Sequence, residues 1–350
     1  SLDGLDIAYV HLQESGGKWS YEIIAAECYP YSAEWKEKLS TAVHLSALRY
    51  QLLHNDYGHY IGKQINHFIE TYQLHHKVDL VSSHGHTTFH VPLQKMTGQV
   101  GNGASIAAEV HLPVVSDLRA MDVAFGGEGA PIVPIGHKLL FNEFNCFLNI
   151  GGIANISVNS NGKYIAFDVC AANRVLNLLA EEMDLPHDDN CPIAAGGIID
   201  QELLAKLNAL DYYKLPYPKS LANSLGVDII YPLIKEAKIT TQNALCTYVE
   251  HIAEQINKAL FDNGVNISNT KLFVTGGGAL NTFLIDRLRA MLSEKGIEVV
   301  VPDEKMIQYK EALIMALIGA LRWREEANVF ASVTGAAENS IGGALWLGRL

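Results

Sequence analysis

Three glycine clusters, widely separated along the chain, limit what this sequence can fold into. They are Asp3-Gly4, Gly151-Gly152 within Asn149–Asn155, and Gly276–Gly278, which Asn281 follows. Glycine lets the backbone approach an anion closely, and its N–H groups supply hydrogen-bond donors. Two such turns can hold the phosphates of one nucleotide, and a third at a helix N-terminus can hold the nucleoside end. The pattern therefore predicts a nucleotide site built from separated segments.

Two common nucleotide-binding motifs do not occur in the sequence. There is no GxxxxGK[ST], which disfavours a P-loop enzyme, and no GxGxxG after a predicted strand, which disfavours a dinucleotide-binding fold. Each glycine cluster alone can be explained as a tight turn. Three clusters beside predicted strands favour the nucleotide interpretation.

The length of 350 residues favours two domains. Hydrophobic residues make up 49% and charged residues 18%, which supports buried cores rather than disorder. Two predicted hairpins after residue 145 suggest that a second domain begins near residue 140. We expect a first domain of residues 1–140 with 332–350, and a second domain of residues 141–331.

Net charge and cysteine content limit the classes of binding partner and the cellular compartment that are expected. The net charge is −12, and so acidic a surface repels nucleic acid and anionic lipid. The five cysteines are odd in number and form no CxxC, which favours a reducing compartment, and we expect a cytoplasmic protein. No apolar run reaches the roughly 18 residues of a membrane span, so no membrane partner is expected.

Asp168 closes a predicted strand, Tyr164–Asp168. A carboxylate there can act as a general base in a cleft between the two domains. It can instead cap the helix that is predicted to begin near Asn173. The residues alone leave both interpretations open.

A second polar motif places Arg119 between Asp117 and Asp122, just before the glycine-rich segment Gly126–Pro131. An arginine can bind a substrate carboxylate through two parallel hydrogen bonds. The alternative is a structural Arg–Asp pair, which is frequent in loops.

Further candidates are single polar residues. His84, His86 and His90 form H-x-H-x3-H, which can bind zinc. No cysteine or further carboxylate lies nearby at ligand spacing, so we expect the histidines to bind a polar ligand or to cap loops, and we expect His84 to bind the substrate. Glu311 begins a predicted helix, where it either points into the cleft or favours the helix N-terminus. Lys219 is expected to be a solvated loop lysine rather than a phosphate ligand.

Taken together, the motifs resemble the anhydro-N-acetylmuramic acid kinases. Ser1–Gly4 is similar to the tail of that family's Gly-Thr-Ser-x-Asp-Gly signature, so we expect the rest of the signature and a first strand to lie ahead of Ser1. The similarity continues, in the family's order, through Ser83–Thr87, Gln99–Ala104, Asp117–Arg119, Asp122–Pro131, Asn149–Asn155, Gly276–Asn281, Lys310–Ala312 and Val333–Ala336.

The resemblance implies an α/β fold, the two-domain actin-like ATPase (ribonuclease H-like) fold, with ATP and Mg²⁺ in an inter-domain cleft. It implies that water opens 1,6-anhydro-N-acetylmuramic acid at C1 while O6 takes the γ-phosphate, giving N-acetylmuramic acid 6-phosphate for cell-wall recycling. Asp168 would activate the water, and Arg119, Glu311 and His84 would bind the sugar. The ATP-binding residues would be Asp3, also the metal ligand, with Gly4, Gly151, Gly152, Asn155, Gly276, Gly277, Gly278 and Asn281. A homodimer is possible.

The chain departs from the family pattern beside the expected sugar site. The family usually has Asp-Thr-Gly-Pro-Gly-Asn where this chain has Asp168–Asn173, and further departures lie at residues 187–191 and 218–223. Two alternatives therefore stay open: a divergent kinase for another sugar, and an ATP-binding regulatory protein that has lost catalysis. Retention of Asp168 favours an enzyme.

Overall fold

The computed structural model describes residues 2–160, 163–185, 188, 191–217, 219–221, 225–261 and 270–348. The chain forms two compact units, one of residues 1–141 and 309–350, and one of residues 142–308. The expected division placed residues 309–331 in the second domain, whereas here they group with the first unit. The boundary falls inside helix α12 (Glu304–Trp323). The domain division stays a prediction.

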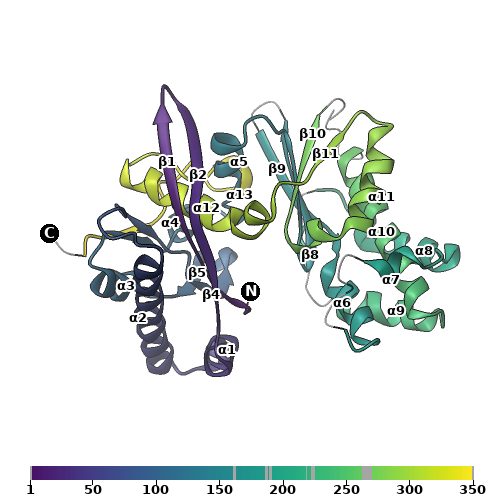
Figure 1. Cartoon of the computed structure of the whole chain (residues 1–350), viewed down its shortest axis with the longest axis horizontal. Coiled ribbons are helices and arrows are strands. Elements are labelled where there is room, and N and C mark those ends of the chain that lie inside the picture. The colour runs from purple at the N-terminus through teal and green to yellow at the C-terminus, as the bar shows by residue number, and fades with distance from the viewer. Residues whose placement is uncertain are drawn as a thin grey trace. The chain divides into compact units, whose positions relative to one another are not determined.

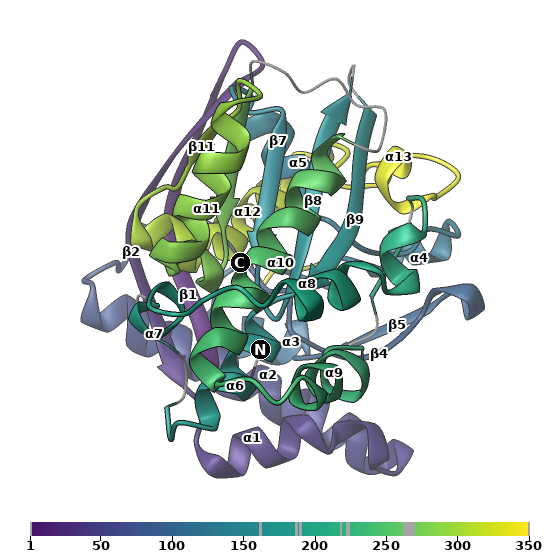
Figure 2. The same ribbon diagram turned by 90° about the vertical axis from the view of Figure 1, so that its right-hand side faces the viewer.

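The second unit is built on one five-stranded sheet, whose strands are shown in Figures 1 and 2. Its strands are β7 (Cys146–Ile150), β8 (Ile153–Ser160), β9 (Lys163–Ala171), β10 (Lys271–Thr275) and β11 (Glu298–Val300). They lie in the order β11-β10-β7-β8-β9, with β8 antiparallel to both neighbours and β10 parallel to β7 and β11. This is the strand order of the ribonuclease H-like sheet, so the predicted α/β fold class is confirmed.

Helices cover this sheet because its strands are apolar. Leu148, Ile150 and Ile156 are almost fully buried, in one core with the long helix α10 (Thr241–Phe261). The Tyr248 hydroxyl of α10 donates to the Ala171 carbonyl at the end of β9, at 2.8 Å. The other helical segments of the unit are α6 (Asn173–Glu181), α7 (Pro192–Ala195), α8 (Gln201–Asn208), η3 (Asp211–Lys214), η4 (Leu225–Ile230), α9 (Tyr231–Glu236), η5 (Gly277–Leu280) and α11 (Thr282–Ser293).

The first unit contains three small sheets. One is the long hairpin of β1 (Gly4–Ser15) and β2 (Lys18–Pro30), drawn in purple in Figure 1. A second pairs β4 (His86–Val91) with β5 (Met96–Val100). The third has the order β12-β6-β3, in which β3 (Val81–Ser82) runs parallel to β6 (Val114–Ser116) and β12 (Ala344–Trp346) antiparallel. The helical segments are α1 (Ala33–Ser40), η1 (Ala42–His44), α2 (Ala47–Thr71), η2 (Pro92–Gln94), α3 (Gly103–Val110), α4 (Ala120–Ala124), α5 (Pro134–Leu140), α13 (Ala331–Thr334) and most of α12.

Residues 33–71 are divided into two α-helices with the short η1 between them, because Thr41 closes α1 and Ser46, with extended backbone angles, precedes α2. The apolar residue Leu48 on the first turn of α2 is 71% exposed, whereas Tyr57 and Phe68 on its later turns are 2% exposed. An apolar residue on α2 is therefore not by itself a sign of the face that is buried.

Among the described residues, none of the helices combines the length and the apolar character that a membrane span requires.

Candidate functional site

The turn Gly151-Gly152 joins β7 to β8 and is fastened to the start of α6. The N–H groups of Ala172 and Asn173 donate to the carbonyls of Gly152 and Gly151, at 2.8 and 3.1 Å. Neither glycine has a positive φ, and an added Cβ would meet nothing closer than 3.6 Å. Neither packing nor backbone conformation therefore requires glycine at these two positions. This favours the interpretation that the missing side chains leave room for a ligand over the interpretation that the glycines only form a tight turn.

The third glycine cluster lies against the same turn. Gly276 has φ +82°, and a Cβ there would lie 2.6 Å from the Ile150 carbonyl oxygen. A Cβ on Gly278 would overlap the Ile150 side chain, whereas one on Gly277 would meet only the Asn173 amide, at 3.6 Å. Two of the three glycines thus serve packing, and Gly277 adds to the bare surface beside Gly151-Gly152. The structure brings these two predicted clusters together in one unit.

Asn281 has a structural role that the sequence did not show. Its side-chain oxygen accepts from the Leu284 N–H at 2.8 Å and caps α11. The residue is only 8% exposed. The position of Asn281 is therefore fixed by the helix that starts there.

A polar row crosses the sheet next to the Gly151-Gly152 turn. Asn155 is paired with Asn149 across β7–β8 and with Asp168 across β8–β9. Directly paired residues project from the same face of a sheet, so the three side chains share one face. Phe167 and Val169, the neighbours of Asp168, project from the opposite face, into the core.

Asp168 is held by a loop rather than by a helix. Its Oδ2 accepts from the Leu221 N–H at 2.9 Å and from the Ser220 hydroxyl at 3.1 Å. Ala172 is the residue at the N-cap of α6, so the alternative that Asp168 caps this helix is wrong. Within the described residues Oδ1 of Asp168 accepts no hydrogen bond, so it can receive a proton from a further donor, as a general base needs.

In the first unit, Arg119 is oriented by two acceptors. Its Nε–H donates to His84 Nε2 at 2.7 Å, and its Nη1 donates to the Gly129 carbonyl at 2.6 Å. The described residues give Arg119 no ion pair with Asp117 or Asp122, so the predicted alternative of an Arg–Asp pair is not what the structure shows. Since Nε is occupied, a substrate carboxylate would have to meet the Nη1 and Nη2 end of the guanidinium.

His84 must be neutral to make this contact. A guanidinium has no acceptor, so His84 Nε2 accepts, and its Nδ1–H, at 3.0 Å, donates to the Gly85 carbonyl. Burial, and then the adjacent Arg119 charge, lower the pKa of His84 to about 4. The imidazole therefore stays an acceptor at neutral pH.

Glu311 is the acidic residue that acts on Arg119 in the first unit. It stands near the start of the part of α12 that belongs to the first unit, close enough to Arg119 to oppose the lowering of the Arg119 pKa by burial. Lys310 beside it is buried, and that burial lowers the pKa of Lys310 to about 8. Arg119, His84 and Glu311, which were predicted as sugar ligands, thus lie in one neighbourhood.

Asp122 joins two motifs that are far apart in the sequence, Asp122–Pro131 and Val333–Ala336. It is fully buried, and its two oxygens accept from the Gly129 N–H at 2.8 Å and from the Thr334 hydroxyl at 2.7 Å. The Glu128 N–H also donates to the Thr334 carbonyl. Sequence reasoning named the Asp122 motif but not this role, because a contact across 212 residues leaves no local pattern.

The remaining predicted residues of the first unit are Asp3, Gly4 and the histidines. Asp3 is exposed, and its carbonyl accepts from the Tyr31 N–H. A Cβ on Gly4 would lie 2.6 Å from Cys28 Sγ, so packing alone requires this glycine. His90 lies at 3.1 Å from the Thr97 hydroxyl, and no cluster of metal-binding side chains occurs in the described parts of either unit.

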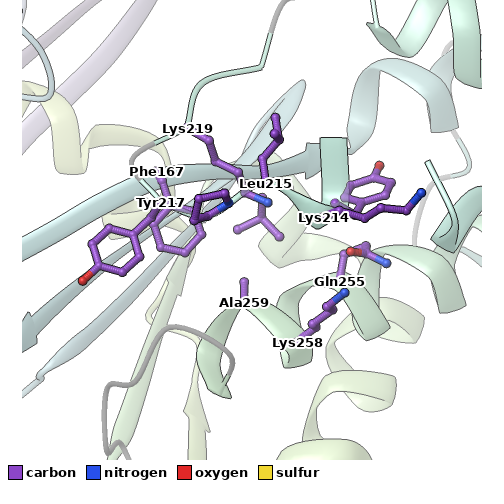
Figure 3. A pocket seen from close by; sticks show the side chains of 11 residues that line it. Phe167, Lys214, Leu215, Tyr217, Lys219, Gln255, Lys258 and Ala259 are labelled. Carbon is purple, nitrogen blue, oxygen red and sulfur yellow. The ribbon is translucent and has the colours of Figure 1, made fainter. Parts of the chain in front are cut away.

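Lys219 lines a cavity of about 500 Å³ in the second unit, shown in Figure 3. Its Nζ lies over the Tyr212 ring, 4.7 Å from the centroid. Phe167 and Val169 also line the cavity, so it lies on the opposite face of the sheet from Asp168. Lys219 is half-buried rather than solvated, which corrects the expectation for this residue.

Several predicted segments fall partly outside the described residues. These are Ser1 and, where the chain departs from the family pattern, residues 187, 189, 190, 218 and 222–223.

A family model described as anhydro-N-acetylmuramic acid kinase matches residues 1–348. Curated relatives carry the same description. One from Vibrio cholerae is 32% identical over 309 residues, covering 83% of this chain and 81% of the relative. One from Hydrogenovibrio crunogenus is 31% identical and covers 99% and 95%.

Likeness to solved structures is weak. A glucokinase of the ROK family from Streptomyces griseus, solved with glucose and AMPPNP, has a TM-score of 0.35 at 13% identity and covers 84% of this chain and 94% of that one. The activator of 2-hydroxyisocaproyl-CoA dehydratase from Clostridium difficile, with bound ADPNP, has a TM-score of 0.37 at 17% identity and covers 61% and 68%.

Proposed function

The chain belongs to the anhydro-N-acetylmuramic acid kinase family, and from this premise we propose that it phosphorylates 1,6-anhydro-N-acetylmuramic acid with ATP in the cytoplasm. Water adds to C1, the bond from C1 to O6 breaks, and O6 takes the γ-phosphoryl group. The products are N-acetylmuramic acid 6-phosphate and ADP. The observation that carries the proposal is the shared placement of the bare glycine turn and Asp168 on one sheet.

Asp168 is the proposed general base. Its Oδ2 is fixed by Leu221 and Ser220, so Oδ1 can take a proton from the attacking water. Asn149 and Asn155 in the same row supply amide groups for the sugar or the nucleotide. Positioning and charge neutralisation are the main requirements of phosphoryl transfer.

The nucleotide ligands are proposed from the glycines of the second unit. The Gly152 N–H makes no hydrogen bond within the described residues, and with Gly151 and Gly277 it forms a surface that any side chain would fill. Such a surface fits a phosphate chain. Mg²⁺ usually binds through one or two carboxylates together with substrate phosphates, and Asp3 is the proposed carboxylate. When bound, the ion would neutralise the charge of the phosphates.

The sugar ligands are proposed from the first unit. Arg119, oriented by His84, is the partner for the carboxylate of the sugar's lactyl group, and Glu311 is an acceptor for a hydroxyl or amide. A homodimer stays a prediction.

The test is product formation. The protein is incubated with Mg-ATP and either 1,6-anhydro-N-acetylmuramic acid or 1,6-anhydro-N-acetylglucosamine, which lacks the lactyl carboxylate. We expect the 6-phosphate by mass spectrometry from the first sugar, and at least tenfold slower turnover of the second. Phosphorylation of another sugar alone would favour the divergent kinase, and binding of ATP without any product would favour the regulatory protein.

A further inference from the structure

The cavity of about 500 Å³ in the second unit lies on the face of the sheet opposite to Asp168 (Figure 3). Three parts of the chain line it: strand β9, residues 213–217 with Lys219 in and after η3, and the C-terminal turns of α10. Sites for small molecules usually measure roughly 300–1,000 Å³. The cavity is therefore large enough for one small organic ligand.

The lining of this cavity is basic, although the chain as a whole has a net charge of −12. Lys214, Lys219 and Lys258 bring ammonium groups from η3, from the loop after it and from α10. None of the described residues that line the cavity is acidic. Lys214 pairs with Asp211 at 2.7 Å, but both side chains are largely exposed, so this ion pair contributes little. The lining therefore attracts a small anion.

Lys219 is the least exposed of the three lysines. Its Nζ donates to the Tyr212 carbonyl at 3.4 Å and lies over the Tyr212 ring. The described contacts thus use one of the three N–H donors of this ammonium group. Burial, and then the charge of Lys258, lower the pKa of Lys219. An anion beside these two lysines would relieve their repulsion and accept from the remaining donors.

Aromatic rings form another part of the wall. The rings of Phe167 and Tyr217 stack, with their centroids 6.0 Å apart and their planes at 21°. In the view of Figure 3 these rings lie on one side of the cavity, and the amino groups of Lys214 and Lys258 lie on the other. A ligand that carries both an anionic group and a ring-shaped body suits this division.

A buried hydrogen-bond network holds the inner wall of the cavity in place. The Tyr213 hydroxyl lies 3.0 Å from His251 Nε2, and His251 Nδ1 lies 2.7 Å from Asn208 Oδ1. The Gln255 amide donates to the same Asn208 oxygen at 2.7 Å. Tyr213 and Gln255 both line the cavity, so a ligand does not have to order this part of the wall.

The segment that carries Lys219 also holds Asp168. The Lys219 carbonyl accepts from the Asp168 N–H at 3.2 Å, and the next two residues donate to the Asp168 carboxylate. The Tyr212 hydroxyl donates to the Asp168 carbonyl at 2.7 Å. A ligand on Lys219 would therefore act on the same segment that positions this carboxylate.

We propose that this cavity binds a phosphomonoester with a single ring, of the size of a hexose phosphate. The phosphate would lie among the three ammonium groups, and the ring would pack on Phe167 and Tyr217. A phosphate is favoured over a carboxylate because its three terminal oxygens can accept from donors on several segments at once. The bound ligand would hold residues 219–221 more firmly and so regulate turnover, a consequence that rests on the proposed function of Asp168.

The test is calorimetric titration of the full chain with N-acetylglucosamine 6-phosphate, N-acetylglucosamine and inorganic phosphate, without ATP or an anhydro sugar. We expect saturable binding of the sugar phosphate, at least tenfold weaker binding of each of the other two, and an affinity that falls as salt is added. Amide hydrogen exchange should become slower at Asp168 and in η3 when the sugar phosphate is bound, because the Asp168 N–H donates to Lys219.

Matched lysine variants locate the site. Lys258→Gln removes one charge from the cavity and should weaken binding of the sugar phosphate at least tenfold, whereas Lys258→Arg keeps the charge and should retain most of the affinity. Lys206→Gln is the control and should leave binding unchanged, because Lys206 pairs with Glu202 on α8. Both lysines are exposed, so these substitutions leave the core intact.

Three results would overturn the proposal: no saturable binding of the sugar phosphate, equal affinity for the neutral sugar or for inorganic phosphate, or unchanged affinity in Lys258→Gln. The last result would place the bound sugar phosphate outside this cavity. An unchanged exchange rate at the Asp168 amide would overturn the link between the cavity and this carboxylate. None of these measurements needs turnover, so their outcome is independent of the proposed kinase activity.

Discussion

His84 Nε2 accepts a hydrogen bond from Arg119 Nε–H at 2.7 Å. The two residues are 35 positions apart, and the contact fixes both the tautomer of the imidazole and the direction of the guanidinium. The end of the Arg119 guanidinium that carries Nη1 and Nη2 therefore has a fixed direction and does not rotate freely.

Replacing His84 tests whether it positions Arg119. His84→Gln can place an acceptor near Nε2 and should keep most activity, whereas His84→Leu should lower kcat/KM for the sugar. A hydrogen bond to a charged group contributes about 1.5–3 kcal/mol, so the loss should be roughly 10- to 100-fold. Steady-state kinetics should show an unchanged KM for ATP.

His90→Leu is the control for this pair, since His90 contacts Thr97 and not Arg119. Equal losses in the glutamine and leucine variants would contradict the acceptor role, and so would a loss confined to the KM for ATP.

Alanine substitutions in the two glycine clusters should distinguish a glycine needed for ligand binding from one needed for folding. An added Cβ at Gly151 or Gly152 meets only ordinary contacts, so Gly152→Ala should keep the wild-type Tm but bind ATP at least tenfold more weakly. Gly278→Ala forces a methyl group onto Ile150 and should cost about 1–3 kcal/mol of unfolding free energy. Calorimetric titration with ATP and denaturant unfolding give the two readouts. An unchanged ATP affinity in Gly152→Ala would remove the phosphate role from this turn.

Buried histidines should make stability depend on pH. Burial lowers the pKa of His251 to about 3, and burial with Arg119 lowers that of His84 to about 4, from an ordinary 6.5. Below pH 6.5 the unfolded chain takes up protons that the native state excludes. The contribution of the two neutral histidines to the free energy of unfolding is therefore complete above pH 6.5. It is lost as pH falls toward 4, by up to about 1.4 kcal/mol per pH unit for each histidine.

Urea unfolding between pH 7 and 5 measures this slope. His251→Gln, which cannot titrate, should show a shallower dependence than the wild type even if it is less stable overall. An identical slope in the variant would contradict the assignment of a buried neutral imidazole at this position.

Local sequence pattern predicted the second unit well. The apolar strand and glycine turn around residues 146–152 are short-range signals, and the strands they predicted are present. The candidate site of the first unit was harder to predict, because its polar residues contact partners that are distant in the sequence. Asp122 reaches Thr334 across 212 residues, and His84 reaches Arg119 from a different loop. No spacing rule in a single sequence reports such contacts.

The C-terminal segment illustrates the same limit. Residues 332–350 are rich in small residues, which favour no particular element, yet Ala344–Trp346 forms β12 against β6. The Trp346 indole donates to the Ser116 hydroxyl at 3.1 Å. A three-residue strand is specified by the partner it meets rather than by its own composition.

The most direct test of the central claim is turnover by the wild type and Asp168→Asn in ¹⁸O-labelled water. Mass spectrometry follows 1,6-anhydro-N-acetylmuramic acid with Mg-ATP. The wild type should give N-acetylmuramic acid 6-phosphate carrying one ¹⁸O, because water opens the bridge at C1. Asp168→Asn keeps an acceptor for Leu221 and Ser220, and it should bind ATP normally but form no product. Full activity in that variant, or a wild-type protein that forms no 6-phosphate, would contradict the account.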